Sequence, residues 1–135
     1  MTHQVISPEG WAPAKGYANG ILTADGTLHI GGQIGWNKDQ VFESHDFIGQ
    51  MEQTLRNIVD IVEAAGGQAS DLVRLTWFVK DKAEYLAKQK EIGRTYQKVL
   101  GRHYPAMAML VVKDLIEDDA LIEIEATASI KSLSK

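Results

Sequence analysis

Hydrophobic and polar residues alternate most regularly near the end of the chain. One set of alternate positions holds Ile122, Ile124, Ala126 and Ala128, and the other holds Leu121, Glu123, Glu125 and Thr127. Because successive side chains of a strand point to opposite faces, Leu121–Ile130 is predicted to be a strand. Its two carboxylates share one face, about 6.5 Å apart along the strand. Periodicity alone indicates a face exposed to solvent.

An acidic loop separates this segment from a second apolar run, Ala106–Val112. This run has no alternation, so we expect a strand covered on both faces. Residues Leu72–Lys80 alternate again and predict another strand. One of its faces is expected to hold Val73, Leu75, Trp77 and Val79, and the other Arg74, Thr76, Phe78 and Lys80.

The first quarter of the chain predicts a hairpin. The segments Tyr17–Thr23 and Leu28–Ile34 flank an Asp25-Gly26 pair, which is a strong turn signal. A short strand is expected before them, at His3–Ile6. Gly31-Gly32 interrupts the second strand and predicts a bulge or the close approach of another group to the backbone. The glycine spacing does not match a dinucleotide-binding fingerprint.

Two segments have the spacing of amphipathic helices. The first carries apolar residues at Phe47, Ile48, Met51, Leu55, Ile58, Val59 and Val62. It predicts about five helical turns that begin at an N-cap, Asp46 or Ser44, and end at Gly66-Gly67. The second follows Asp81, which forms a possible capping box with Glu84, and ends at Gly101. Its inward stripe is expected to contain Tyr85, Ile92, Tyr96, Val99 and Leu100.

This order of elements predicts an α+β fold in one domain, residues 1–135. The helices are long enough to connect parallel strands, and right-handed crossings would place both on one face of a mixed sheet. The other face would retain apolar side chains, including Met107, Met109 or their neighbours. Exposure of such a face predicts self-association.

Composition narrows the function. The chain of 135 residues has no cysteine, which excludes disulfides and thiolate chemistry. No apolar run approaches the roughly 18 residues of a membrane helix, and no signal-peptide pattern opens the chain, so we expect a cytoplasmic protein. A net charge of −4 argues against general nucleic-acid binding.

Few residues have a spacing typical of a metal site or a catalytic pair. The four histidines, His3, His29, His45 and His103, are dispersed and form no metal-ligand spacing, so no metal or cofactor is expected. Glu123 and Glu125 cannot act as a glycosidase pair, because neighbours on one strand cannot flank a scissile bond from opposite sides.

Several motifs together resemble the RidA/YjgF family of small enamine and imine deaminases along nearly the whole chain. They are Gly16-Tyr17-x-x-Gly20, Gly32-Gln33-Ile34, Asn57–Gly67, Phe78–Asp81, and Tyr104-Pro105-Ala106 leading to Ile122–Ala126. The resemblance implies a chorismate-mutase-like sheet with two helices on one face. It further implies a homotrimer whose subunits pack their open faces together and leave three clefts for a small molecule.

The same resemblance assigns the candidate site. Family deaminases carry, directly after the Pro-Ala pair, an arginine that clamps the substrate carboxylate, and here that position is Met107. Met109 replaces a frequent small polar or thiol residue, and Gly31 replaces a serine. Glu123 matches the glutamate that holds the attacking water and is the expected catalytic residue. The expected substrate-binding residues are Tyr17, Gly31, Gly32, Met107 and Met109.

Met107 leaves two functions open. Methionine cannot hold a carboxylate, and losing a charge-assisted bond costs about 1.5–3 kcal/mol. Small amino-acid imines are therefore disfavoured unless Arg102, His103 or Lys15 supplies a cation. The first function is hydrolysis of an imine or enamine intermediate, with Glu123 as general base and its pKa raised by burial. The second is non-catalytic binding of a small apolar metabolite, to which methionine adapts well.

Overall fold

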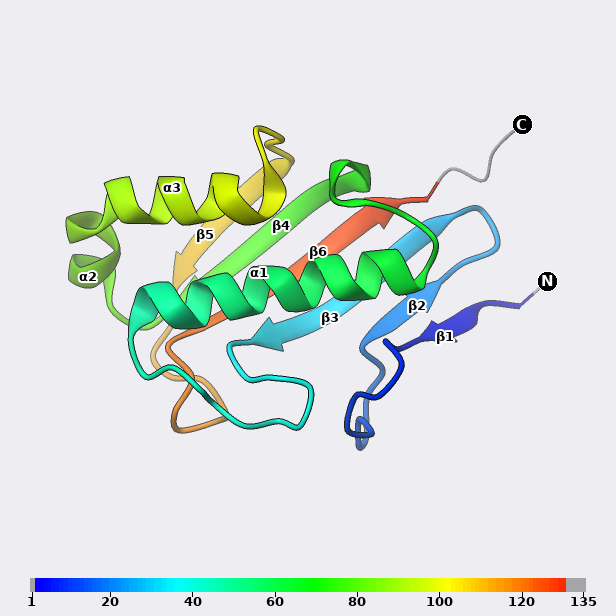
Figure 1. The fold of residues 1–135 in the computed structure, drawn as a ribbon, viewed down its shortest axis with the longest axis horizontal. Helices are drawn as coiled ribbons and strands as arrows, with labels where there is room; N and C mark the ends of the chain where they lie inside the picture. Colours follow the sequence, from blue (N-terminus) through cyan, green and yellow to red (C-terminus); the bar gives the residue numbers. More distant parts are fainter. Residues whose placement is uncertain (1, 131–135) are drawn as a thin grey trace.

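The computed structural model describes residues 2–130, which form one six-stranded mixed sheet (Figure 1). The strands lie in the order β1-β2-β3-β6-β4-β5. Only β4 and β5 are parallel, and every other neighbouring pair is antiparallel. The strands are β1 (Gln4–Ile6), β2 (Gly20–Leu22), β3 (Thr27–Ile34), β4 (Leu72–Val79), β5 (Ala106–Val111) and β6 (Ile122–Ser129).

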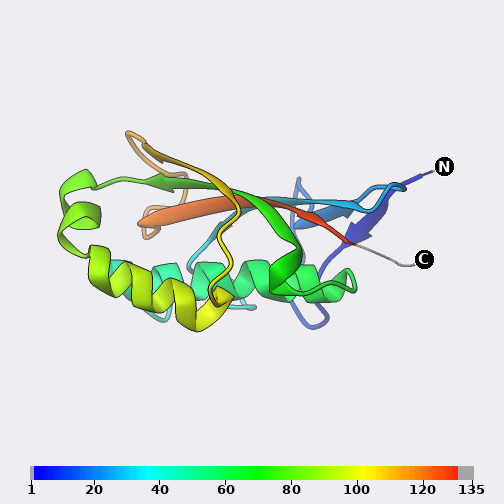
Figure 2. The same cartoon turned by 90° about the horizontal axis from the view of Figure 1, so that it is seen from above.

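The long helices cover one face of this sheet (Figure 2). They are α1 (Phe47–Ala64) and α3 (Gln89–Leu100), joined to the strands through a 3₁₀ turn η1 (Ala69–Asp71) and a short helix α2 (Lys82–Ala87). The predicted α+β class and the helices on one face are confirmed. We call the sheet face opposite the helices the open face. No helix of the described chain has the length and apolarity needed to cross a membrane.

The core lies between α1, α3 and the sheet. The alternation of β6 is confirmed, because its inward residues Ile122, Ile124, Ala126 and Ala128 are all buried. They meet α1 residues that are fully or almost fully buried, among them Phe47, Met51, Leu55 and Ile58. Asp46 is the N-cap of α1, since its carboxylate accepts the Gly49 N–H. β6 therefore runs through the middle of the core and carries its other face outward.

Two buried polar side chains of α1 fix the ends of the central strands. Gln50 donates to the carbonyls of Ser44 (3.1 Å) and Asp119 (2.8 Å) and accepts from the Leu121 N–H (2.8 Å). Asn57 donates to the carbonyls at the end of β3 and just beyond it. Gln50 thus sets where β6 begins, one residue before its first strand position.

Several predicted boundaries are corrected. In β4 the register shifts between Leu72 and Arg74, so Leu72 is buried and Val73 is exposed, contrary to the predicted face. The predicted strand from Tyr17 begins only at Gly20. The preceding residues form a bend that lies beside β3, where the Gly31 N–H donates to the Asn19 carbonyl (2.9 Å).

Two further predictions were wrong. The second long helix is two helices, because Lys88 leaves the helical conformation (φ −114°, ψ 24°) and is the C-cap of α2. The segment Ala106–Val111 is not covered on both faces in the single chain. It is an edge strand, paired only with β4, and every residue except Met109 is exposed.

Candidate functional site

Glu123 lies on the open face, against a glycine. In the sheet register it is opposite Ile34 of β3 and Phe78 of β4. The register of β3 shifts between Ile30 and Gln33, which confirms the bulge predicted at Gly31-Gly32. A Cβ placed on Gly32 would overlap the Glu123 carboxylate. The predicted close approach to this backbone is therefore confirmed, and the approaching group is the candidate catalytic residue itself.

The environment of Glu123 favours its neutral form. Burial raises the pKa of its carboxyl group above the ordinary value, and the nearby charge of Glu125 raises it further. No hydrogen bond from the described chain lowers that pKa. A carboxylate whose pKa is raised binds a proton more readily, which is the property a general base needs near neutral pH.

The glycine bulge is held rigid from one side. The buried Gln33 side chain donates to the Gly31 carbonyl (3.1 Å) and to Asn19 Oδ1 (3.3 Å). The loop carrying Tyr17 lies against this bulge, since a Cβ on Gly31 would be 3.1 Å from the Ala18 carbonyl oxygen. The Tyr17 side chain is half exposed. The structure thus places Gly32 against Glu123, with Gly31 next to it and the loop that carries Tyr17 against the same bulge.

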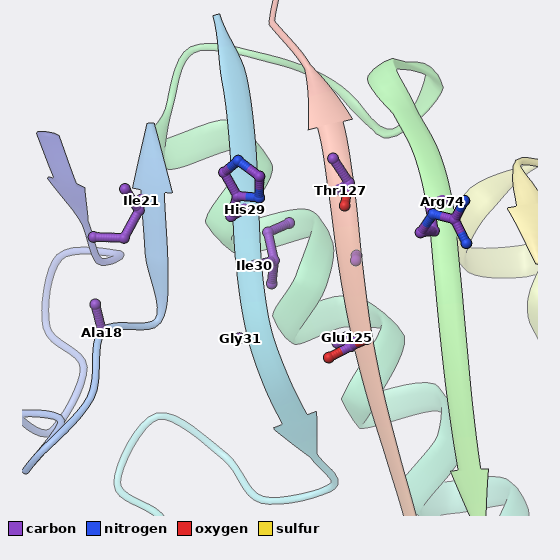
Figure 3. Close-up of a pocket in the computed structure, with 9 residues that line it drawn as sticks. Ala18, Ile21, His29, Ile30, Gly31, Arg74, Glu125 and Thr127 are labelled. Atoms are coloured by element: carbon purple, nitrogen blue, oxygen red, sulfur yellow. The ribbon is translucent and has the colours of Figure 1, made fainter. Parts of the chain in front are cut away.

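A hollow of about 360 Å³ opens beside the bulge (Figure 3). Its lining residues are Ala18, Ile21, His29, Ile30, Gly31, Arg74, Glu125, Ala126 and Thr127. We call it the open-face hollow. Arg74 and His29 were not singled out from the sequence as site residues. The alternation of β4 predicted that Arg74 and Trp77 point to opposite faces of the strand. Only the strand order shows which side chains of other strands surround Arg74.

Met107 and Met109 lie on the opposite face. In the β4–β5 register they pair with Leu75 and Trp77, whose side chains face the helices. They line an apolar recess of about 300 Å³ between β5 and α3, which we call the methionine pocket. Its other lining residues are Trp77, Tyr85, Gln89, Ile92, Gly93, Tyr96 and Tyr104.

Aromatic stacking stiffens the methionine pocket. The Tyr96 and Tyr104 rings stack with centroids 5.4 Å apart and planes within 8°. Tyr96 also stacks on Trp77, and its hydroxyl donates to the His103 carbonyl (2.6 Å). Burial raises the pKa of Tyr96 to about 12, so this phenol stays neutral. The wall is an uncharged aromatic surface.

Within one chain the structure does not bring the predicted site residues together. Glu123, Gly31 and Gly32 are at the open face, whereas Met107 and Met109 are at the face covered by α3. A sheet separates the two groups. A cleft that uses both groups must therefore be completed by a second chain.

The alternative cations considered above are not equivalent. His103 Nε2 lies 2.7 Å from the Leu72 carbonyl oxygen and so ties the turn after α3 to β4. Arg102 and Lys15 are exposed and line neither recess. Among residues 2–130 no three His, Asp or Glu side chains are grouped as metal ligands would be.

Sequence and structure comparisons agree on the family. The sequence model of the family described as Endoribonuclease L-PSP matches residues 9–130. A RutC family protein of Haemophilus influenzae is 36% identical over 128 residues, 95% of this chain and 98% of the relative. A RutC family protein of Pyrococcus horikoshii is 34% identical and covers 93% and 96%.

The chain belongs to the RidA/YjgF family. Among solved structures, a Rid family protein of Yersinia pestis superposes with a TM-score of 0.82 at 26% identity, covering 96% of this chain and all of that one. RidA from an Antarctic Psychrobacter gives a TM-score of 0.79 at 28% identity, covering 94% and 99%. These RidA/YjgF relatives confirm the fold implied by the motifs.

Proposed function

We propose that this RidA/YjgF protein hydrolyses an imine or enamine intermediate, with Glu123 as the general base. The observation that carries the proposal is the Glu123 carboxyl group, half-buried, free of hydrogen bonds from the described chain and raised in pKa, against the side-chain-free Gly32. The glycine leaves room for the carboxylate itself, which a side chain at position 32 would displace.

The reaction needs only one proton acceptor. Glu123 takes a proton from water as the water oxygen bonds to the imine carbon. The C=N π electrons move onto the nitrogen, which takes that proton to give a neutral carbinolamine. Glu123 then moves the hydroxyl proton to the nitrogen, the carbon–nitrogen bond breaks, and a carbonyl compound and ammonia leave. The raised pKa of Glu123 suits both the uptake and the return of this proton.

The proposed assembly is a homotrimer with three inter-subunit clefts. It is supported by the separation of the site residues, since Glu123 and the methionine pocket lie on opposite faces of one sheet. Exposed apolar residues at the sheet edge, including Met107, Leu110 and Val111, also favour burial by another chain. Each cleft would combine Tyr17, Gly31, Gly32 and Glu123 with Met107 and Met109. We expect this trimer to act in the cytoplasm, without nucleic acid.

The substrate is expected to lack a carboxylate beside the imine. Met107 and Met109 join an aromatic wall in an almost wholly apolar recess, and no described cationic side chain lines it. A carboxylate would lose its water there without gaining a charge-assisted partner. An apolar or ring-bearing imine would instead contact the methionines and the Tyr104 ring.

A second candidate function is binding without catalysis. The methionine pocket carries this alternative, because it can hold a small apolar metabolite whether or not Glu123 acts on it. The two functions differ in whether imine decay is accelerated. Both functions require an apolar ligand.

Two imines generated in place test the proposal. Monoamine oxidase acting on benzylamine releases an imine without a carboxylate, and L-amino-acid oxidase acting on phenylalanine releases one with it. Imine decay is followed by trapping with semicarbazide, with and without the protein. We expect the protein to accelerate decay of the uncharged imine more, and Met107→Arg to reverse this preference by about tenfold or more.

Variants of the carboxylates separate the outcomes. Glu123→Gln should abolish the acceleration, whereas Glu117→Gln in the exposed loop before β6 should not change it. Activity that survives Glu123→Gln would remove the catalytic assignment. No acceleration of either imine, together with binding of a neutral aromatic probe such as quinoline, would establish the non-catalytic alternative.

A further inference from the structure

The wall of the methionine pocket contains a buried hydrogen-bond donor. Trp77 of β4 lines the pocket and is only 2% exposed. Among the residues that the structure describes, its indole nitrogen Nε1 is the one buried side-chain nitrogen or oxygen without a hydrogen-bond partner. A buried donor without an acceptor costs free energy, and native proteins contain few of them. This N–H therefore indicates an acceptor that the described chain does not supply.

The side chains around Trp77 offer its N–H no good acceptor. In the sheet register Trp77 lies between Ile124 of β6, which has no polar side-chain atom, and Met109 of β5, whose sulfur is a weak acceptor. The Tyr96 ring stacks on Trp77 with the two planes within 23°. An indole N–H lies in the plane of its own ring, so the face of a nearly parallel ring cannot accept it. The donor therefore remains available for a ligand.

Met109 can give a ligand access to this N–H. It is the direct neighbour of Trp77 on β5, is partly exposed, and lines the same recess of about 300 Å³. A methionine side chain has three rotatable bonds and adapts to irregular shapes. A change of its rotamer opens the side of the indole to the pocket without moving the stacked rings.

We propose that the methionine pocket selects a neutral ring with a hydrogen-bond acceptor, a ring nitrogen or ring carbonyl, which accepts the Trp77 indole N–H. Trp77 is then a specificity-determining residue. The proposal rests on the proposed function, in which this pocket holds the apolar part of the substrate, and it adds one polar atom to that part. A hydrocarbon ring of the same shape leaves the donor unpaired and is disfavoured.

4-Methylpyridine and toluene test this pairing. They have the same shape, but only 4-methylpyridine carries a lone pair on a ring nitrogen. Binding to the full-length protein is followed by NMR above the pKa of 4-methylpyridine, where this probe is neutral. The chain has three tryptophans, so the indole N–H resonances are few and can be assigned by replacing each tryptophan in turn. 4-Methylpyridine should shift the Trp77 indole proton downfield, and toluene should not.

A double-mutant cycle removes the difference in water solubility between the two probes. Trp77→Phe deletes the N–H and changes the pocket volume equally for both. It should weaken 4-methylpyridine about fivefold more than toluene, which corresponds to about 1 kcal/mol. Trp11→Phe is the matched control, because Trp11 is a partly buried tryptophan that does not line the pocket. It should change neither affinity.

Two results would overturn the proposal. One is a Trp77 indole resonance that responds alike to both probes, or to neither, in the unaltered protein. This measurement does not depend on the folding of a variant. The other is a cycle in which Trp77→Phe weakens both probes by the same factor. The proposed hydrolysis is decided separately, because these experiments contain no imine and leave Glu123 unaltered.

Discussion

Replacing Gln50 should loosen the start of β6, the strand that carries both candidate carboxylates. Its side chain is fully buried and makes three hydrogen bonds, at 2.8, 2.8 and 3.1 Å. At about 1 kcal/mol net for each bond, Gln50→Met should lower the free energy of unfolding by about 3 kcal/mol. Methionine keeps the side-chain length, so this variant isolates the loss of the bonds from the loss of volume.

Gln50→Ala should cost about 1 kcal/mol more, because it also leaves a cavity. Gln53→Ala is the matched control one turn away, since Gln53 is partly exposed and makes one bond, to Asn57. Its effect should stay below about 1 kcal/mol.

Urea unfolding at one fixed protein concentration measures these differences, because association would otherwise change apparent stability. For 135 residues a loss of about 3 kcal/mol corresponds to a fall in Tm of about 10 °C. If the free energies of unfolding of Gln50→Met and Gln53→Ala differed by less than about 0.5 kcal/mol, the role of Gln50 in holding the start of β6 would be refuted.

Three further predictions concern the two faces of the sheet. The pKa of Glu123 is raised in the folded protein. Its contribution to the free energy of unfolding is therefore fully present below the unfolded pKa of 4.5 and is lost as pH rises through the folded pKa. Glu123→Gln should thus gain stability over the unaltered protein between pH 4 and 7 in urea unfolding, and a constant difference would contradict the pKa shift. Gly32→Ala should displace the Glu123 carboxylate and reduce imine hydrolysis at least about tenfold, while circular dichroism shows the fold retained. Gly93→Ala should stabilise by about 0.5–1 kcal/mol in the same denaturation assay, because a Cβ there meets open space within α3, and destabilisation would show that the room is absent.

The local sequence pattern predicted the structure correctly where a feature depends on one strand alone. The alternation of β6 predicted which residues enter the core, and Gly31-Gly32 predicted a bulge, because each depends on the strand itself. The break at Lys88 could not be predicted in this way. No glycine or proline marks it, and the helical spacing continues across it.

The candidate site depended on register, which no single strand encodes. Alternation shows that Met107 and Met109 share a face, but only their pairing with Leu75 and Trp77 shows that this is the helix face. Likewise, Arg74 and His29 are far apart in the sequence, and only the register shows that both lie beside Thr127. A motif can therefore name candidate site residues while leaving open which chain of an assembly supplies each one.

The position of β6 in the sheet also has a consequence for synthesis on the ribosome. Among the described residues β6 is the last strand in chain order, yet it lies between β3 and β4, and its register joins Thr27 to Ser129. Until residues 122–129 emerge, the edges of β3 and β4 have no partner and the apolar side of α1 has no complete sheet to cover. We therefore expect the nascent chain to need protection from aggregation until its final strand is released, and then to fold slowly for its size.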